Sequence, residues 1–229
     1  PEALPIKMLT VAAIACSLLV RPAAVPLHRT PAPARLSSPQ MATEELIEQF
    51  VDWLEGVPGA VFRTSSELEG DAANMLVPMR VLAGVLMIHH GSEGGIGPAN
   101  FGTDGFDGFV TYVLTPYFGF LPGAPDSLPA WAAVHDYVEF FGGLCVALGL
   151  LTRPSSFALF VCMLAAVYFH LASTGLQGFP LGHVESYSYN FEEPALYAAV
   201  FLFFSVVGAG PLSADERIYR SLVEGLGEE

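Results

Sequence analysis

Four apolar stretches, each close to the length of a bilayer core, constrain this chain more than any other feature of its sequence. A helix needs about 20 apolar residues to cross the hydrocarbon core, and each stretch is near that length, some slightly short. Only 14% of the residues are charged, whereas a soluble domain normally carries about 25%. The sequence therefore predicts an all-α protein, a four-helix transmembrane bundle with an N-terminal amphipathic helix. The four predicted spans cover about residues 75–91, 131–151, 155–172 and 194–210.

The positions of the arginines predict how these spans are oriented. If there are four spans, every arginine after residue 42 falls on the side that holds the N-terminus. The far-side loops, about 92–130 and 173–193, contain no Lys or Arg. The positive-inside rule then places both termini on the cytoplasmic or stromal side. Three or five spans would scatter the same residues over both sides, and these residues are Arg63, Arg80, Arg153, Arg217 and Arg220.

The first 41 residues are typical of a targeting segment. Lys7 precedes an apolar run over residues 8–20, which suits the core of a signal peptide. The stretch that follows is basic and free of acidic residues, as in a transit peptide. Together the two parts resemble the address of proteins sent to plastids bounded by extra membranes, whereas the first part alone fits bacterial secretion. We expect a plastid location, in the thylakoid or the envelope.

The remaining segments complete the predicted organisation. Residues 42–70 hold an amphipathic helix over 43–55, followed by a linker. The polar face of this helix is acidic, so it docks to a partner or lies at the membrane interface, with both alternatives open. The membrane domain covers residues 71–215, and residues 216–229 form an acidic C-terminal tail. Segment 109–121 is apolar and aromatic but too short to cross, so it re-enters the membrane or lies at the interface.

Small residues in two of the spans predict where helices approach closely. In lipid, small side chains let helix backbones come together where hydrophobicity does not drive association. A plain abundance of Gly and Ala in membrane helices is the other explanation. The residues concerned are Gly142, Gly143, Ala147 and Gly149 in the second span and Ala195, Ala198 and Ala199 in the fourth.

Charge and cysteine content exclude several classes of function. The chain has 9 basic and 23 acidic residues, a net charge of −14. Nucleic acids and anionic membrane faces need clustered Lys and Arg, so neither is an expected partner. The three cysteines show no C-x-x-C spacing, which argues against a disulfide framework or a zinc site. No H-E-x-x-H sequence occurs, so we predict no metal site.

Polar residues within the second span are the first candidates for chemistry. A carboxylate at Glu139 is costly inside a membrane and needs a partner or water. His135 lies one turn away on the same helix face, and Asp136 is nearer the interface. The structural explanation is a protonated Glu139 bonded to a neighbouring helix. The functional explanation is a proton relay through Glu139 and His135, or part of a quinone pocket.

The histidines after the targeting segment all fall at or near the far side in the four-span arrangement. Imidazoles can bind a metal, ligate the magnesium of chlorophyll, or pass protons to a quinone. They also occur at interfaces because they tolerate both water and lipid. The pattern predicts a polar site on the far side, formed from His89, His90, His135, His170 and His183.

Several segments together resemble the DoxX family of membrane proteins over about residues 75–215. They are RVLAGVLMIHHG (80–91), EFFGGLCVALGLLTRP (139–154), AVYFHLASTGLQGFP (166–180) and FEEPALYAAVFLFF (191–204). The resemblance implies a four-helix membrane bundle. Some members of that family are linked to sulfur-compound oxidation with quinone as the acceptor, or to membrane oxidoreductase complexes. The positions carried over by the resemblance are Arg80, His90, Glu139, Arg153 and His170.

Two functional hypotheses of different class follow. The first is a component of a quinone-linked membrane redox system in a plastid, with Glu139 and His135 as proton relay. The residues expected to bind the cofactor are then His89, His90, His170, His183, Arg80 and Arg153. The second is a non-catalytic accessory subunit of a photosynthetic membrane complex, in which His or Glu ligates chlorophyll. The expected partners are the lipid bilayer and other subunits of a membrane complex.

Overall fold

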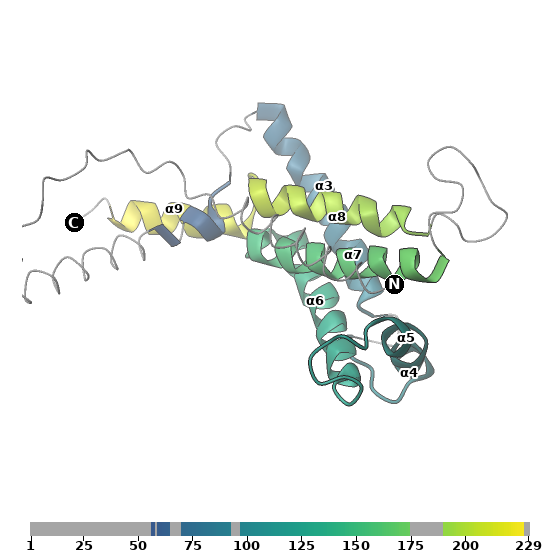
Figure 1. Ribbon diagram of the computed structural model, residues 1–229. Coiled ribbons are helices and arrows are strands. Elements are labelled where there is room, and N and C mark those ends of the chain that lie inside the picture. Colours follow the sequence, from purple (N-terminus) through teal and green to yellow (C-terminus); the bar gives the residue numbers. More distant parts are fainter. Residues whose placement is uncertain (1–55, 58, 65–69, 93–96, 175–189, 227–229) are drawn as a thin grey trace, which may run out of the picture. The chain divides into compact units, whose positions relative to one another are not determined.

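The computed structural model describes residues 56–57, 59–64, 70–92, 97–174 and 190–226. Within these residues the regular structure is helical, with no strand (Figure 1). The chain divides into two units, residues 1–57 and 58–229, and the helices reported below all belong to the second. The predicted targeting segment 1–41, the predicted helix over 43–55, and His183 lie outside the described residues. The predicted all-α class is confirmed for the part of the chain that is described.

Four long helices coincide with the four predicted apolar stretches. They are α3 (Gly70–His90), α6 (Leu128–Leu148), α7 (Thr152–Thr174) and α8 (Glu192–Val207). By length and composition, α3 and α7 can cross a bilayer. Helix α8 has 16 residues, fewer than the roughly 20 that a full crossing needs. Helix α6 has 21 residues, but polar side chains in its first half lower its hydropathy.

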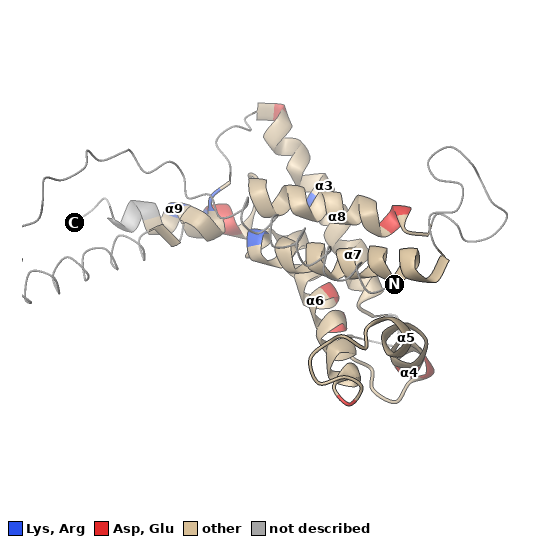
Figure 2. Cartoon of the chain, viewed as in Figure 1, with Lys and Arg blue, Asp and Glu red and all other residues tan. Residues whose placement is uncertain are grey.

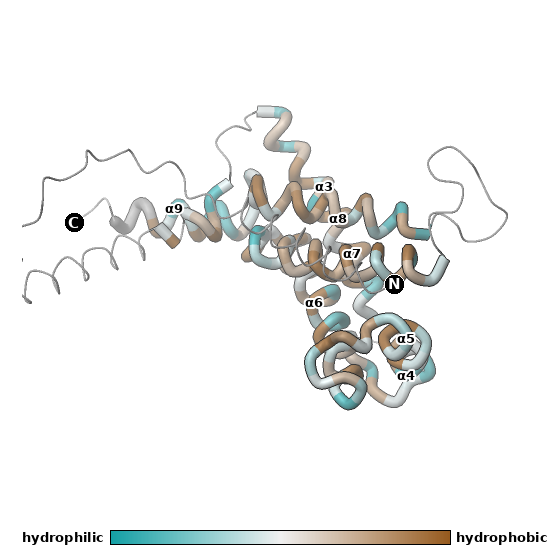
Figure 3. The backbone as a smooth tube through the Cα atoms, in the orientation of Figure 1, coloured by the Kyte–Doolittle hydropathy of each residue, from teal (hydrophilic) through white to brown (hydrophobic). Residues whose placement is uncertain are grey.

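The outer faces of these helices are apolar, and Figure 3 shows hydrophobic colour along all four. In the apolar stretches of α3 and α7, 28% and 17% of the residues are buried, whereas the core helix of a soluble protein would be mostly covered. Large exposed apolar patches mark surfaces that meet lipid or a partner. The exposed side chains include Leu82 and Val85 on α3, Val134, Phe141 and Leu148 on α6, Val161 on α7, and Leu196 and Val206 on α8.

Helices α3 and α6 cross with their backbones in contact. A Cβ atom on Gly84 would lie 2.5 Å from the carbonyl oxygen of Gly143 and 2.6 Å from the amide nitrogen of Ala147. A Cβ atom on Gly143 would lie 2.7 Å from the carbonyl oxygen of Gly84. Only glycine at both positions permits this approach, which is how small residues promote helix association in lipid. The predicted close contact at Gly143 and Ala147 is confirmed.

A polar network joins the C-terminal end of α6 to the start of α9 (Ala214–Leu226). Arg80, only 2% exposed, donates hydrogen bonds to the carbonyl oxygens of Ala147 at 2.6 Å and Leu212 at 2.8 Å. Asp215 accepts hydrogen bonds from the amides of Leu151 at 2.7 Å and Thr152 at 2.8 Å. Asp215 therefore caps the N-terminus of α7, where a negative charge is favoured. Figure 2 shows acidic and basic segments together where α9 meets α7.

The capped helix α9 includes residues that the sequence assigned to an acidic tail. Ser213 acts as its N-cap, because the Ser213 hydroxyl accepts a hydrogen bond from the amide of Glu216 at 3.1 Å. Glu216 in turn pairs with Arg220 at 2.7 Å, one turn along the helix. Residues 216–226 of the predicted tail are therefore helical.

Between α3 and α6, short helical segments form a structure that we call the aromatic cap, residues 104–121. It comprises α4 (Asp104–Phe109), the π-helical turn η1 (Val110–Leu114) and α5 (Thr115–Tyr117). Its apolar side chains pack on the first turns of α6 and the last turns of α7. The predicted short apolar segment 109–121 is thus a packed cap over one end of two long helices. The buried side chains of this cluster include Phe106, Leu114, Phe118, Leu128 and Ala132.

Candidate functional site

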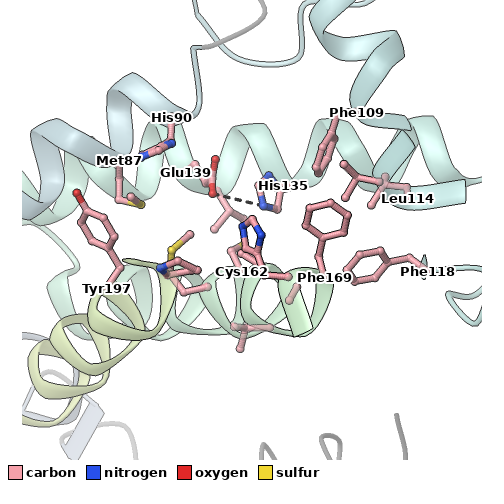
Figure 4. Close-up of a pocket in the computed structure, with 18 of the residues that line it drawn as sticks. Met87, His90, Phe109, Leu114, Phe118, His135, Glu139, Cys162, Phe169 and Tyr197 are labelled. Atoms are coloured by element: carbon pink, nitrogen blue, oxygen red, sulfur yellow. Dashed lines mark ion pairs between the residues drawn. The ribbon is translucent and has the colours of Figure 1, made fainter. Parts of the chain in front are cut away.

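A cavity of about 1090 Å³ lies between α3, α6, α7, α8 and the aromatic cap (Figure 4). Ligand pockets commonly measure roughly 300–1,000 Å³ and combine apolar walls with a few polar groups. The walls here are mainly aliphatic and aromatic. Each of the four long helices nevertheless contributes polar side chains, namely His90, His135, Glu139, Cys162, His170, Glu192, Glu193 and Tyr197.

On α6, three titratable side chains lie next to one another near the middle of the helix, beginning at the cavity. The Glu139 side chain is 7% exposed, and its Oε1 lies 3.3 Å from Nε2 of His135. Nδ1 of His135 lies 3.8 Å from Oδ1 of Asp136, whose side chain is 22% exposed. Asp136 Oδ2 accepts a hydrogen bond from the Ala99 amide at 3.1 Å. The imidazole therefore stands between a buried carboxyl group and a more accessible one.

The other polar groups come from the helices on the remaining sides. The ring of His90, the last residue of α3, lies 6.2 Å from the ring of Tyr197 on α8. On α7, the His170 ring lies 5.1 Å from the ring of Phe169, which also lines the cavity. His135 itself packs against Phe109 of the aromatic cap at 5.2 Å between ring centroids. Aromatic rings thus frame the polar groups.

The structure brings four of the predicted site residues to this cavity: His90, His135, Glu139 and His170. His89 is exposed and does not line it. Arg80 and Arg153 do not line it either. Arg80 belongs to the network with Ala147, and Arg153 Nε donates to the Arg63 carbonyl oxygen at 3.1 Å. His183 lies outside the described residues.

Sequence reasoning missed Tyr197 and Cys162 as cavity residues. Tyr197 lies four residues after Glu193, so both share one face of α8 and both line the cavity. That spacing was a usable signal, because the pair puts two polar groups on one side of an apolar helix. Cys162 gave no such signal, since a cysteine in an apolar helix usually acts as a small hydrophobic residue. Among the described residues no group of three His, Cys, Asp or Glu side chains is placed to hold a metal ion.

The cavity reaches the apolar outer surface between α6 and α7. Val134 on α6 and Val161 on α7 both line it, and they are 51% and 45% exposed. Trp131, 37% exposed, lines the same side. A lipid-soluble compound could therefore enter sideways from a bilayer without crossing water.

Comparison with known proteins finds a family model that matches part of this chain. Residues 75–172 match the family described as DoxX. An uncharacterized protein of Haemophilus influenzae is 33% identical over 88 residues, which are 38% of this chain and 61% of the relative. The chain thus spans about three fifths of the length of that relative. No solved structure matches it. The matched residues include most of α3, the aromatic cap, α6 and most of α7, so this part of the chain is similar to the DoxX family of membrane proteins.

Proposed function

We propose that this protein is a four-span component of a quinone-linked redox system in a plastid membrane, and that its cavity binds the quinone ring. One observation carries the proposal. Glu139, a residue 5% exposed, contacts His135 in an apolar cavity that reaches the lipid-facing surface. Carboxyl groups inside membranes are costly, and they commonly mark proton relays or ligand sites.

The chemistry assigned to the chain is the movement of protons. A quinone takes up two electrons and two protons when it is reduced to a quinol. Glu139 delivers or accepts one proton at one ring oxygen, and His135 exchanges that proton with Asp136 near the far side. Imidazole suits this position because its two nitrogens face two carboxyl groups and because an imidazole ordinarily gains and loses a proton near neutral pH. The second proton is exchanged at the other ring oxygen by His90, which lines the cavity from α3. The electrons come from a partner redox protein.

The topology in this proposal has both termini on the stromal side. The arginine contacts support it, since Arg80 reaches Leu212 and Arg153 reaches Arg63, so the basic segments gather at one end of the helices. The far-side loops carry no Lys or Arg. In this proposal the short α8 and the polar α6 cross the membrane beside α7, against which both pack. The cavity then opens in the far half of the bilayer.

Quinone binding can be tested through Trp131. The chain holds two tryptophans, Trp53 and Trp131, so a Trp53→Phe background leaves the cavity residue as the only indole. We expect decylplastoquinone to quench its fluorescence saturably in lipid nanodiscs, because quinones quench an indole in contact with them. Absence of saturable quenching would refute quinone binding.

The proton relay has a separate test. With one quinone bound per protein, Glu139→Gln should slow quinol formation by dithionite by about 10²-fold, the lower end of what general acid–base catalysis contributes. Asp126→Asn, the same chemical change on an exposed loop, should leave the rate unchanged. If the Glu139→Gln protein forms quinol at the wild-type rate and still shows quenching of Trp131, the proton relay is refuted and quinone binding is not.

A second candidate function is an accessory subunit of a photosynthetic membrane complex. The exposed aromatic face of α6, with Tyr137 at 48% and Phe141 at 49% exposed, favours it, because aromatic residues are enriched in interfaces. His90 or His170 would then ligate chlorophyll. The absorption spectrum of the purified protein decides: chlorophyll bands lost in His170→Ala support this role, and bound quinone without pigment contradicts it.

A further inference from the structure

We infer that Tyr197 is a second hydrogen-bonding group for the ligand, opposite Glu139 and His135, so that the cavity selects rings with two oxygen atoms on opposite sides. This inference rests on the proposed function and narrows its substrate class to para-quinones. It concerns a residue on α8, which lies outside the residues matched to the DoxX family.

The Tyr197 ring is held in place by its neighbours. It stacks on Phe201 with 6.1 Å between centroids and 17° between planes. It also meets His90 edge-on, at 6.2 Å and 80°. Phe201 is 0% exposed, so the stacking partner is itself fixed by the surrounding helices. A ring packed on two sides presents its hydroxyl group in one direction, which favours a specific contact over a mobile one.

The hydroxyl group of Tyr197 is available to a ligand. Among the described residues no hydrogen bond joins this hydroxyl to another group, whereas the hydroxyl of Tyr168 donates to the Tyr117 carbonyl oxygen at 3.2 Å. Tyr197 is half-buried and lines the cavity. A half-buried phenol in an apolar cavity gains most from a partner that the ligand supplies.

Glu139 on α6 and Tyr197 on α8 both line the cavity, and Figure 4 shows their side chains apart from each other on different helices. The two groups differ in chemistry. Glu139, beside His135, can give up or take a proton, whereas a tyrosine hydroxyl keeps its proton at neutral pH and donates a hydrogen bond. One ring oxygen would therefore exchange protons on the α6 side, and the other would be held by the phenol on the α8 side.

This arrangement predicts selectivity by the number of carbonyl groups. A ring with one carbonyl satisfies the α6 side and leaves the Tyr197 hydroxyl without a partner in a cavity from which the ring has displaced water. An unsatisfied polar group costs more than a neutral hydrogen bond contributes. The expected ligand is thus a para-quinone in preference to a monoketone of the same shape.

The test compares 1,4-naphthoquinone with 1-tetralone, a similar bicyclic compound with one carbonyl. Both compounds are titrated into the Trp53→Phe protein in nanodiscs. Quinone binding is measured by quenching of Trp131 fluorescence, and ketone binding is measured by competition with the quinone. Tyr197→Phe should weaken quinone binding about fivefold, the contribution of one neutral hydrogen bond. The same change should strengthen ketone binding, because it removes the hydroxyl group that the ketone leaves unsatisfied. Tyr137→Phe, on the exposed face of α6, should change neither. An unchanged thermal midpoint confirms that the stacking on Phe201 is retained.

Each other outcome overturns a definite statement. If the Tyr197→Phe protein binds the quinone as tightly as wild type, or loses equal affinity for both compounds, the role of Tyr197 is wrong and quinone binding stands. If neither compound binds to the wild-type cavity, both the inference and the proposed function are wrong.

Discussion

At the crossing of α3 and α6, one added methyl group on Gly143 should lower the stability of the protein measurably. A Cβ atom there would lie 2.7 Å from the Gly84 carbonyl oxygen and 2.9 Å from the Ile88 amide nitrogen. Both are backbone atoms of α3, so the helices must separate rather than a side chain turn away. Overpacking of this kind costs about 1–3 kcal/mol, while replacing Gly by Ala within a helix returns at most about 1 kcal/mol.

The separation also acts on the hydrogen bond between Arg80 and Ala147. Ala147 lies one turn after Gly143, and its carbonyl oxygen receives the Arg80 Nη1 hydrogen bond at 2.6 Å. A hydrogen bond to a charged group contributes about 1.5–3 kcal/mol. If this bond lengthens as the helices part, Gly143→Ala should lower the free energy of unfolding by about 2–4 kcal/mol in total.

The adjacent glycine provides the matched control. A Cβ atom on Gly142 would meet the Leu159 side chain, at 3.2 Å from its Cγ, and no backbone atom within 4 Å among its three nearest neighbours. The gain in helix propensity then offsets a small shift of Leu159, so Gly142→Ala should stay within about 1 kcal/mol of wild type. Unfolding by SDS in mixed micelles, followed by circular dichroism, measures both variants. Equal stability of Gly143→Ala and wild type would refute the account of the crossing.

Two further variants test the polar network and the aromatic cap. Asp215→Ala removes the acceptor of the Leu151 and Thr152 amides and should cost about 1–2 kcal/mol in the same unfolding assay, whereas Asp126→Ala, on an exposed loop, should cost nothing measurable. Phe118→Ala removes a ring that is 7% exposed and should cost about 3 kcal/mol and shift the Trp131 emission; Phe120→Ala, 50% exposed, should change both far less, and equal effects of the two would contradict the packing of the cap.

The helices were predictable from sequence because apolar runs of this length leave few alternatives. The boundaries follow local signals as well: Pro129 lies in the first turn of α6, and Gly149 ends it with a φ of 67°. The aromatic cap was only partly predictable. The composition of segment 109–121 is apolar and aromatic, but its apolar residues do not recur at a regular helical or strand spacing. Its path depends on tertiary contacts with α6 and α7, and a single sequence does not encode those visibly.

The sequence indicated which polar residues belong to a site, but it indicated less about how they are arranged around the cavity. His135 and Glu139 share a helix face by spacing alone, so their contact followed from the sequence. His90 and His170 meet the same cavity only because α3 and α7 pack on either side of α6, a fact of tertiary structure. Arg80 shows the converse, since the family resemblance suggested that it binds a cofactor, whereas its observed partners are the backbone carbonyls of Ala147 and Leu212.

Asp215 caps α7 from a position outside the segment that matches the family. The family match ends at residue 172, yet the first turn of α7 obtains its acceptor from residue 215. A fragment truncated at the edge of the match would keep every matched residue and leave the Leu151 and Thr152 amides without the carboxylate that accepts their hydrogen bonds. The segment that matches the family is therefore shorter than the segment that supplies the cap of α7.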